Sequence, residues 1–542
     1  MLALFLDLHG VRSVLFNTEE TTRWHPKGST QNARTMEHYR RLGISGPIRG
    51  LGLPADHPAD VAYFTRFGGH ELARLKMPST TDARRATANA PKTDQVPEPL
   101  HRANQMYVED FLLGHVRTRP NITLRFGWRV ERFIDDAAGV TIDAVCERNG
   151  AQEAWRSEYL AGCDGGQGDV RRTLGISYSG QSLHQPYMGG KMFSTYVKVP
   201  ALQREFLRGD PCFQYWIINP ELRTTVTSVN GVDEFMFWTR AKNDSSQADD
   251  AAVIQAMRRS TKSDIAVEVI AHHPWTAGMA LVAERYGAGR VFLAGDAVHL
   301  FTPTGGFGMN TGIDDAANLA WKLSAMVQGW GGSGLLSSYE AERKPVAVRN
   351  TGAARELSRN IGDIAVPPEL EDDGASGEAA RRTLGALLAT CGEQYKSIGV
   401  QLGARYDGSP IIAAEGMPPS DSFISYTASS VPGGRAPHVW LDDGRGFGSS
   451  LYDRLGAGFT LLHLGPHPPE TTALTDAAAA RKMPLRTLTV ADPDIRDFYN
   501  CDLVLIRPDQ HVAWRGNAAP QDASALLARL VGANTDTQPQ GN

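Results

Sequence analysis

The chain of 542 residues contains few cysteines, and their placement excludes two kinds of site. Only five are present, none forms a Cys-x-x-Cys pair, and no spacing suits a metal site. An odd number also argues against a framework of disulfides. We therefore expect the cysteines to be reduced and mostly structural: Cys146, Cys163, Cys212, Cys391 and Cys501.

Long apolar runs and a basic excess are also absent. No uninterrupted apolar stretch approaches the ~20 residues that a membrane-spanning helix needs. The opening run of residues 1–8 has no basic start and carries Asp7, so it does not resemble a signal peptide. The net charge of -5 offers no basic surface for nucleic acid or anionic lipid. These absences predict a cytoplasmic protein that binds small molecules, with no nucleic-acid or membrane partner.

The length and the hydrophobic pattern predict several domains of the α/β class. A single hydrophobic core usually stops growing near ~250 to 300 residues. Residues 2–9 predict a helix and residues 11–16 a buried parallel strand, which together make the second half of a β-α-β unit. Residues 122–161 alternate apolar with polar positions, as in a β-meander, and residues 190–240 predict a separate antiparallel sheet.

The second half of the chain begins with a short apolar strand at residues 290–295. A Gly-rich loop follows, and then helices are expected at about 310–327 and 335–360. The segment 366–377 is rich in Pro, Gly and acidic residues, which is typical of a linker. Short strands and helices between residues 459 and 531 predict a small α/β domain.

The Gly-rich stretch of residues 290–310 has the composition of a ligand-binding turn. Gly295 and Asp296 follow a strand, at the end where open α/β sheets bind ligands. The glycines allow close approach of a planar ring, and the following helix N-terminus favours an electron-rich ring edge. A Gly-rich loop before a core helix is the alternative. The residues expected at the ligand are Gly295, Asp296, Pro303, Gly305, Gly306, Gly308, Met309 and Asn310.

This stretch resembles the second flavin motif of the class A flavoprotein aromatic hydroxylases, which are FAD-dependent monooxygenases. Asp164 and Gly165, in the run Cys-Asp-Gly-Gly-Gln-Gly-Asp-Val-Arg-Arg, resemble the Asp-Gly motif of that family. The resemblance implies that Asp164 helps to hold the pyrophosphate side of FAD and the visiting NAD(P)H. A turn before a solvated basic helix is the alternative for this motif alone.

Two further positions resemble the family more weakly, and a third departs from it. Gln105 stands where the family has a glutamine near the ribityl chain, and Arg34 where an arginine meets the flavin phosphates. A polar residue on a surface helix is the alternative for both. Asn17 departs from the family, which usually has an acid there for the adenosine ribose, and Glu19 is a substitute for it.

The resemblance implies a fold of three parts. A Rossmann-like FAD-binding domain (residues 1–185 and 275–330) is interleaved with an antiparallel-sheet substrate domain (186–274). A helical connector (331–400) leads to a thioredoxin-like domain (401–542), as in the phenol-hydroxylase branch of the family. Cys501 stands alone where redox chemistry would need a Cys-x-x-Cys pair, so we expect a structural or dimerising role for this domain and leave a homodimer open.

A second departure concerns the phosphate loop. No Gly-x-Gly-x-x-Gly occurs near the start, and residues 1–8 already predict the helix that should follow such a loop. We therefore expect the first strand and the loop to be missing, the recorded start to be an internal methionine, and FAD binding to be poor without an N-terminal extension. The alternative is a truncated, flavin-free and non-catalytic remnant.

The resemblance implies hydroxylation of a phenolic or polyketide aromatic ring with NADPH or NADH and O2, through a flavin C4a-hydroperoxide. Another flavin oxidoreductase on the same fold is an alternative, although the Trp-x-Trp-x-Ile signature of halogenases is absent. Candidates for an aromatic pocket are Tyr215, Phe235, Phe237 and Trp238, with core packing as the alternative for each. Candidates for assisting phenol deprotonation are Tyr196, His272 and His273, and we assign no catalytic base.

Overall fold

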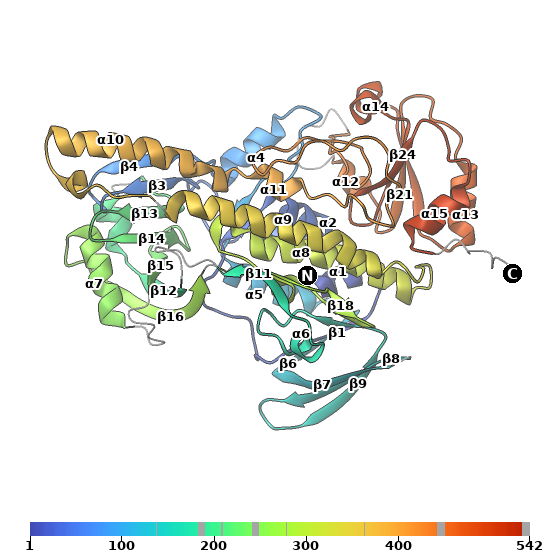
Figure 1. The fold of residues 1–542 in the computed structure, drawn as a ribbon, viewed down its shortest axis with the longest axis horizontal. Coiled ribbons are helices and arrows are strands. Elements are labelled where there is room, and N and C mark those ends of the chain that lie inside the picture. The colour runs from blue at the N-terminus through green and yellow to red at the C-terminus, as the bar shows by residue number, and fades with distance from the viewer. Residues whose placement is uncertain are drawn as a thin grey trace.

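The computed structural model describes residues 1–533 except 137, 183–189, 208–209, 241–248, 278, 363 and 442–449. Two long helices, α8 (Phe307–Val327) and α9 (Ser337–Gly362), run through the middle of the molecule (Figure 1). A large sheet lies at one end of these helices and a small α/β unit at the other. In the described residues no helix is long and apolar enough to cross a membrane.

The N-terminal segment forms the helix and strand that the sequence predicts. Helix α1 (Leu2–Leu8) packs on α8 through Phe5 and Leu6, and strand β1 (Ser13–Asn17) pairs in parallel with β6 (Ile122–Phe126). We expected a buried strand, but every residue of β1 is only partly buried because its other side faces a cavity. The helices that follow are α2 (Ala33–Arg41), α3 (Ser45–Arg49), α4 (Thr80–Ala88) and α5 (Gln105–Val116).

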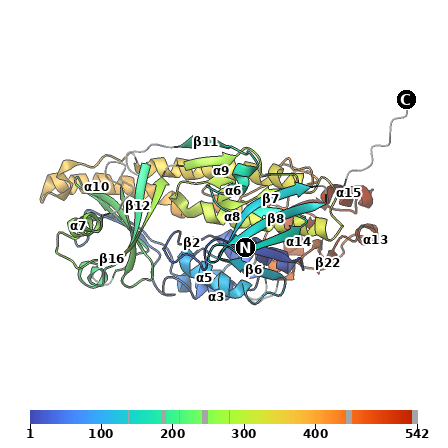
Figure 2. The ribbon, with the colours of Figure 1, turned by 90° about the horizontal axis from the view of Figure 1, so that it is seen from below.

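A second parallel pair joins β10 (Leu160–Gly162) to β19 (Val291–Leu293), with β18 (Gly287–Ala288) on its far side. The predicted meander is confirmed as β7 (Trp128–Asp136), β8 (Gly139–Cys146) and β9 (Gln152–Ser157). In Figure 1 this meander lies below the long helices, beside β6, and in Figure 2, which views the molecule from below, it lies on the viewer's side. Smaller elements of the region are α6 (Asp169–Thr173), β11 (Tyr178–Ser182), β17 (Met279–Ala283) and β20 (His299–Leu300).

The large sheet has seven strands in the order β16-β12-β15-β14-β13-β3-β4. Its antiparallel part comes from the predicted block, but β3 and β4 come from a stretch that we had placed in the FAD-binding domain. Strand β3 pairs in parallel with β13, and α7 (Asp250–Thr261) packs on one face. The strands are β3 (Val61–Phe64), β4 (Glu71–Leu75), β12 (Gly190–Lys198), β13 (Gln214–Ile218), β14 (Arg223–Ser228), β15 (Glu234–Arg240) and β16 (Glu268–Ala277).

The segment predicted as a linker is built into the structure at this sheet. Leu370 is fully buried in a cluster with Tyr63 and Trp216, and α10 (Ala375–Thr390) packs on β4. The apolar side chains within the acidic stretch explain why it is held against the sheet. Helix α11 (Ile398–Leu402) then leads towards the C-terminal unit.

The C-terminal unit is a four-stranded mixed sheet in the order β22-β21-β23-β24. Strand β21 pairs in parallel with β22 and antiparallel with β23, and β23 pairs antiparallel with β24, so the predicted small α/β unit is confirmed, while its thioredoxin-like character stays a prediction. Cys501 is buried and free. The elements are α12 (Leu451–Arg454), β21 (Phe459–Leu464), α13 (Thr472–Ala480), β22 (Leu485–Val490), α14 (Pro493–Tyr499), β23 (Leu503–Ile506), β24 (Val512–Gly516) and α15 (Ala523–Leu530).

Buried histidines make the fold sensitive to acid. Burial lowers the pKa of His101 to about 4 and that of His438 to about 3. His438 bridges the carbonyl of Asp94 at 2.6 Å and the hydroxyl of Ser450 at 3.0 Å, which links the C-terminal unit to the N-terminal part. These rings stay neutral in the folded protein, whereas the unfolded chain takes up protons near pH ~6.5.

We therefore expect the free energy of unfolding to fall as the pH drops from about 6.5 towards 4. Each such histidine contributes a slope of about 1.4 kcal/mol per pH unit, because the unfolded state binds the extra proton. Urea unfolding at several pH values measures this slope. In the variant His438→Asn this slope should be smaller by the contribution of one histidine. A slope equal to that of the parent protein would contradict the conclusion that His438 stays neutral in the folded state.

Candidate active site

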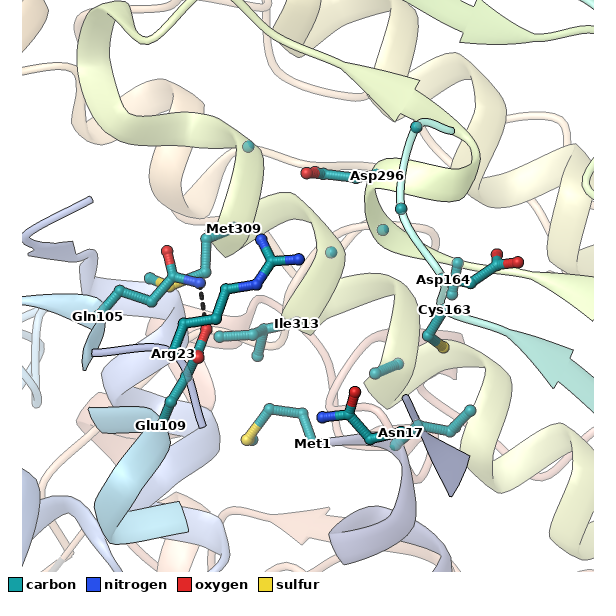
Figure 3. Close-up of a pocket in the computed structure, with 18 of the residues that line it drawn as sticks. Met1, Asn17, Arg23, Gln105, Glu109, Cys163, Asp164, Asp296, Met309 and Ile313 are labelled. Atoms are coloured by element: carbon teal, nitrogen blue, oxygen red, sulfur yellow. Dashed lines mark hydrogen bonds between the residues drawn. The ribbon is translucent and has the colours of Figure 1, made fainter. Parts of the chain in front are cut away.

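A cavity of about 2180 Å³ connects the parts of the molecule that the sequence singled out. It runs from the free edge of β1, past the N-terminus of α8, to one face of the seven-stranded sheet. Figure 3 shows Asp296, Met309 and Ile313 on one side of it, and Asn17 and Cys163 near Met1. In the described residues no group of three or more His, Cys, Asp or Glu side chains is placed to hold a metal ion.

The Gly-rich loop forms the middle of the cavity wall. Gly295 and Asp296 line the cavity, as do Pro303, Gly305, Gly306, Gly308 and Met309. Gly306 begins α8 with a φ of 66°, in the left-handed region that favours glycine, and no side chain caps this helix. The first N–H groups of α8 therefore face the cavity without a side-chain acceptor, where they and the helix dipole favour an electron-rich group.

Close packing leaves no room for larger residues where this loop meets α8. A Cβ atom on Gly312 would lie 3.0 Å from the Cα atom of Gly295, and one on Gly306 would lie 3.1 Å from the Cβ atom of Thr30. Gly295 itself has a φ of 64°. The loop is therefore held against the helix at a distance that only glycine permits, which leaves its backbone open to the cavity.

Buried charges behind the loop fix its position. Asp315 on α8 accepts hydrogen bonds from the backbone N–H of Gly295 at 3.2 Å and from the ring of His299 at 2.7 Å. Arg343 on α9 donates to Asp315 at 2.8 Å and to Asp314 at 2.6 Å. Burial alone would raise the pKa of Asp315, but His299 and Arg343 hold it below its usual range. Sequence patterns do not predict this network, and its one signal in the sequence is the Asp314-Asp315 pair within an apolar helix.

Asp164 and Gly165 also line the cavity, at the carboxyl end of β10. One carboxylate oxygen of Asp164 accepts the backbone N–H of Val170 at 2.9 Å, which fixes the start of α6. Gly165 adopts a φ of 86°, so the turn requires glycine. The Asp-Gly motif thus forms a turn before a basic helix and faces the cavity as well.

The remaining predicted residues divide into two groups. Gln105 lines the cavity and donates to Glu109 at 2.5 Å. Arg34 and Asn310 do not line it. Arg34 binds Glu37 at 2.8 Å and Gln510 at 2.9 Å, and Asn310 donates to the carbonyl of Thr30 at 2.9 Å. Both hold the surrounding structure together, so we leave them out of the proposed ligand contacts.

The end of the cavity beside α1 is built differently. Asn17 lies there, and its side chain accepts the backbone N–H of Glu19 at 3.2 Å. In the described part of the chain no strand joins the β1-β6 pair to the β10-β19 pair. Residues 11–18 and 157–166, which include β1 and β10, both line the cavity. In the described residues this end contains two unpaired parallel strand edges, and no Gly-x-Gly-x-x-Gly loop precedes α1.

The opposite end is an aromatic wall made by the seven-stranded sheet. Trp216, Met236 and Trp238 line it together with polar side chains of the same face: Ser194, Gln214, Thr225, Thr227 and His273. Of the four aromatic candidates only Trp238 is confirmed as a lining residue. Tyr215, Phe235 and Phe237 point the other way and are buried against α7, because strand alternation places them on the far face.

The three candidates for proton transfer are also separated. His273 lines the cavity, whereas His272 binds Asp250 at 2.6 Å and Tyr196 donates to Glu234 at 2.5 Å. Burial, and then the positive charge of Lys27, lower the pKa of His273. His273 is therefore neutral near pH 7 and has a nitrogen that can accept a proton.

Comparisons with known proteins agree with this arrangement. A family model described as an FAD binding domain matches residues 1–354, and one described as the C-terminal part of aromatic-ring hydroxylases matches residues 429–534. The FAD-dependent monooxygenase opdD of Penicillium oxalicum is 32% identical over 92% of this chain and 98% of its own. The tetracenomycin A2 monooxygenase-dioxygenase of Streptomyces glaucescens is 31% identical over 99% and 96%.

Among solved structures, the rebeccamycin biosynthetic enzyme RebC with reduced flavin superimposes with a TM-score of 0.86 at 33% identity. The match covers 98% of this chain and 97% of that one. Sequence, fold and cavity therefore lead to the same conclusion: this chain belongs to the family of FAD-dependent aromatic-ring hydroxylases.

Proposed function

We propose that this chain hydroxylates a phenolic or polyketide aromatic ring, using FAD, O2 and NADPH or NADH. The observation that carries the proposal is the meeting of two different walls in one cavity. One wall is the glycine loop at the N-terminus of α8, and the other is the aromatic face of the seven-stranded sheet. A 32% identical relative from Streptomyces halstedii, described as a putative polyketide hydroxylase, supports a polyketide substrate.

The loop around Gly295 and Gly306 fits the ring and ribityl end of FAD. Its glycines let the backbone approach a flat ring, and the N-terminus of α8 favours negative charge at the ring edge. Asp296 has a carboxylate that can accept hydrogen bonds from ribityl hydroxyls. When bound, FAD supplies the redox chemistry that activates O2.

The aromatic wall positions the substrate and keeps water away from it. Trp216, Met236 and Trp238 offer flat and adaptable apolar surface for a ring. The lowered pKa of His273 keeps its ring unprotonated near pH 7, so that a ring nitrogen is available to accept the phenolic proton. Lys27 and Arg23 also line the cavity, and their positive charge stabilises the resulting phenolate.

The adenosine and pyrophosphate end of FAD requires a further element. A dinucleotide site of this kind needs a strand and a Gly-rich loop so that the backbone can approach the pyrophosphate. We propose that one more parallel strand fits between β1 and β10, and that tight FAD binding depends on it. The two free strand edges along the cavity support this proposal.

The direct test of the activity uses the protein with this strand and loop fused ahead of Met1. We expect oxidation of NADPH or NADH that is stimulated by 1-naphthol, with one oxygen atom from isotopically labelled O2 in the product. Hydrogen peroxide without an oxygenated product, for 1-naphthol and for larger fused phenols, would favour an oxidase. Failure to bind FAD at all would favour the non-catalytic alternative.

The formation of a homodimer through the C-terminal unit stays a prediction. A homodimer would double the mass measured by sedimentation at micromolar concentration. A monomer would leave this unit with a structural role in holding α8 and α9.

A further inference from the structure

Arg102 is a buried cation that lines the cavity without a carboxylate partner. It lies in the short strand β5 (His101–Arg102), which pairs with β2 (Thr30–Gln31), and its relative exposure is 6%. Four other buried arginines, Arg34, Arg343, Arg435 and Arg507, each bind at least one Asp or Glu side chain. No described acidic side chain binds Arg102.

The guanidinium of Arg102 is nevertheless held in one orientation. Its Nη1 atom donates to the hydroxyl of Thr30, and its plane lies over the ring of Phe213 with 4.1 Å from Cζ to the ring centroid. The buried Nε atom has no acceptor among the described residues. The Nε and Nη2 atoms share one edge of the guanidinium, the edge that binds a carboxylate with two parallel hydrogen bonds.

The charge state of the Arg102 guanidinium agrees with a role in binding an anion. Burial lowers the pKa of Arg102 to about 10, and Tyr395 acts against this shift. The side chain is thus still charged near pH 7. A buried charge without a partner costs several kcal/mol of stability in general, so such a residue is usually retained for binding.

Arg102 lies between the glycine loop at the N-terminus of α8 and the aromatic wall of the seven-stranded sheet. Thr30, its hydrogen-bond partner, touches Gly306 at the start of α8. On the other side, Tyr395 donates to Gln214 at 2.9 Å and receives the indole N–H of Trp216 at 3.3 Å, so the adjacent wall is polar and aromatic. An aromatic ring lying on this wall would bring a substituent towards Arg102.

We propose that Arg102 binds an anionic oxygen substituent of the aromatic substrate, with a carboxylate as the best geometric match, and so selects acidic over neutral aromatics. This inference rests on the proposed function only in taking the same cavity as the substrate site. It assigns a binding role and no chemical step to Arg102.

The test compares two probes that differ by one charged group, 1-hydroxy-2-naphthoate and 1-naphthol. Their dissociation constants are measured by calorimetry at pH 7.5 on the full chain without FAD, so that a failure of flavin binding does not affect the result. The variants are Arg102→Gln, Arg102→Lys, and Arg382→Gln as a control at an exposed position of α10 that does not line the cavity. Thermal unfolding of each variant is recorded in parallel.

We expect Arg102→Gln to weaken binding of the naphthoate by about 10- to 100-fold, the range for a hydrogen bond to a charged group. Binding of 1-naphthol should change by less than about twofold, and Arg102→Lys should fall between, because it keeps the charge and loses the paired geometry. Arg102→Gln should also unfold at the same or a higher temperature, since it removes an unpaired buried charge.

Equal weakening of both probes would overturn the proposal, as would unchanged binding of the naphthoate or failure of the parent chain to bind it. A lower unfolding temperature for Arg102→Gln would assign the residue a structural role. The Arg102→Gln variant is also measured in the strand-extended protein, which carries the added strand and loop ahead of Met1. A loss of FAD affinity there, without loss of naphthoate binding, would indicate that Arg102 binds the flavin and not the substrate.

Discussion

Replacing Glu342 with alanine is expected to lower the free energy of unfolding by about 3 to 5 kcal/mol, the usual effect of removing one partner of a buried ion pair. Glu342 lies on α9 and is fully buried. It binds Lys322 of α8 at 2.6 Å and Arg507 of the C-terminal unit at 2.5 Å. The alanine variant leaves both cations without this carboxylate.

Further contacts of Arg507 explain why Glu342 also couples the C-terminal unit to the rest of the protein. Arg507 binds Asp509 at 2.6 Å, and Asp509 accepts from Asn318 of α8 at 3.1 Å. Although burial alone would raise the pKa of Glu342, Arg507 and Lys322 hold it well below its usual range. The pair therefore stays charged at neutral pH and links three segments that are distant in the sequence.

Denaturant unfolding followed by both fluorescence and circular dichroism measures this effect. The matched control is Glu378→Ala, which removes an exposed pair with Arg382 at 2.5 Å on α10. That control should change stability by less than about 0.5 kcal/mol, as exposed helix pairs do. A loss below about 1 kcal/mol for Glu342→Ala would contradict the role that we assign to the network.

The second large effect is expected at Gly306. Alanine at this position places a Cβ atom against Thr30 and forces the left-handed start of α8 to shift. We expect FAD affinity, measured in the strand-extended protein, to fall by about 10- to 100-fold, which corresponds to one or two lost hydrogen bonds. Titration of the protein with FAD, followed by flavin fluorescence, gives this value.

Gly329 provides a control that separates strain from ligand contact. Its φ is 76°, yet a Cβ atom there meets nothing within 4 Å, and it does not line the cavity. Both Gly306→Ala and Gly329→Ala should cost about 1 kcal/mol of stability through backbone strain. Equal FAD affinities in the two variants would remove Gly306 from the proposed site.

Local sequence patterns predict much of the fold and part of the site. Strand alternation indicates that Phe237 and Trp238 lie on opposite faces of the sheet, but it does not say which face meets a cavity. The structure was needed to separate Trp238, which lines the cavity, from Tyr215, Phe235 and Phe237, which do not. The glycine motif located the loop because glycine is required by local backbone geometry. Asn310, in the same motif, instead ties α8 to the backbone of Thr30.

Local sequence patterns do not reveal contacts between residues that lie far apart in the chain. Arg34 has the residue type of a phosphate ligand, but Gln510 and the carbonyl of Asp509, more than 470 positions away, take up its guanidinium. Strands β3 and β4 join the large sheet through pairing with β13, about 150 positions later. No sequence pattern singles out Arg102. Its distinguishing feature is that no Asp or Glu side chain among the described residues binds its guanidinium, and only the structure shows this.

We propose, centrally, that the glycine loop and the N-terminus of α8 hold the ring end of FAD, and that tight binding of its phosphate end depends on one more parallel strand between β1 and β10. Equilibrium FAD binding, measured side by side on the chain as printed and on the same chain carrying a strand and Gly-x-Gly-x-x-Gly loop ahead of Met1, tests it most directly. We predict weak binding by the printed chain and at least ~100-fold tighter binding by the extended one, equivalent to about 2.7 kcal/mol. Absence of bound flavin in both proteins would contradict the account.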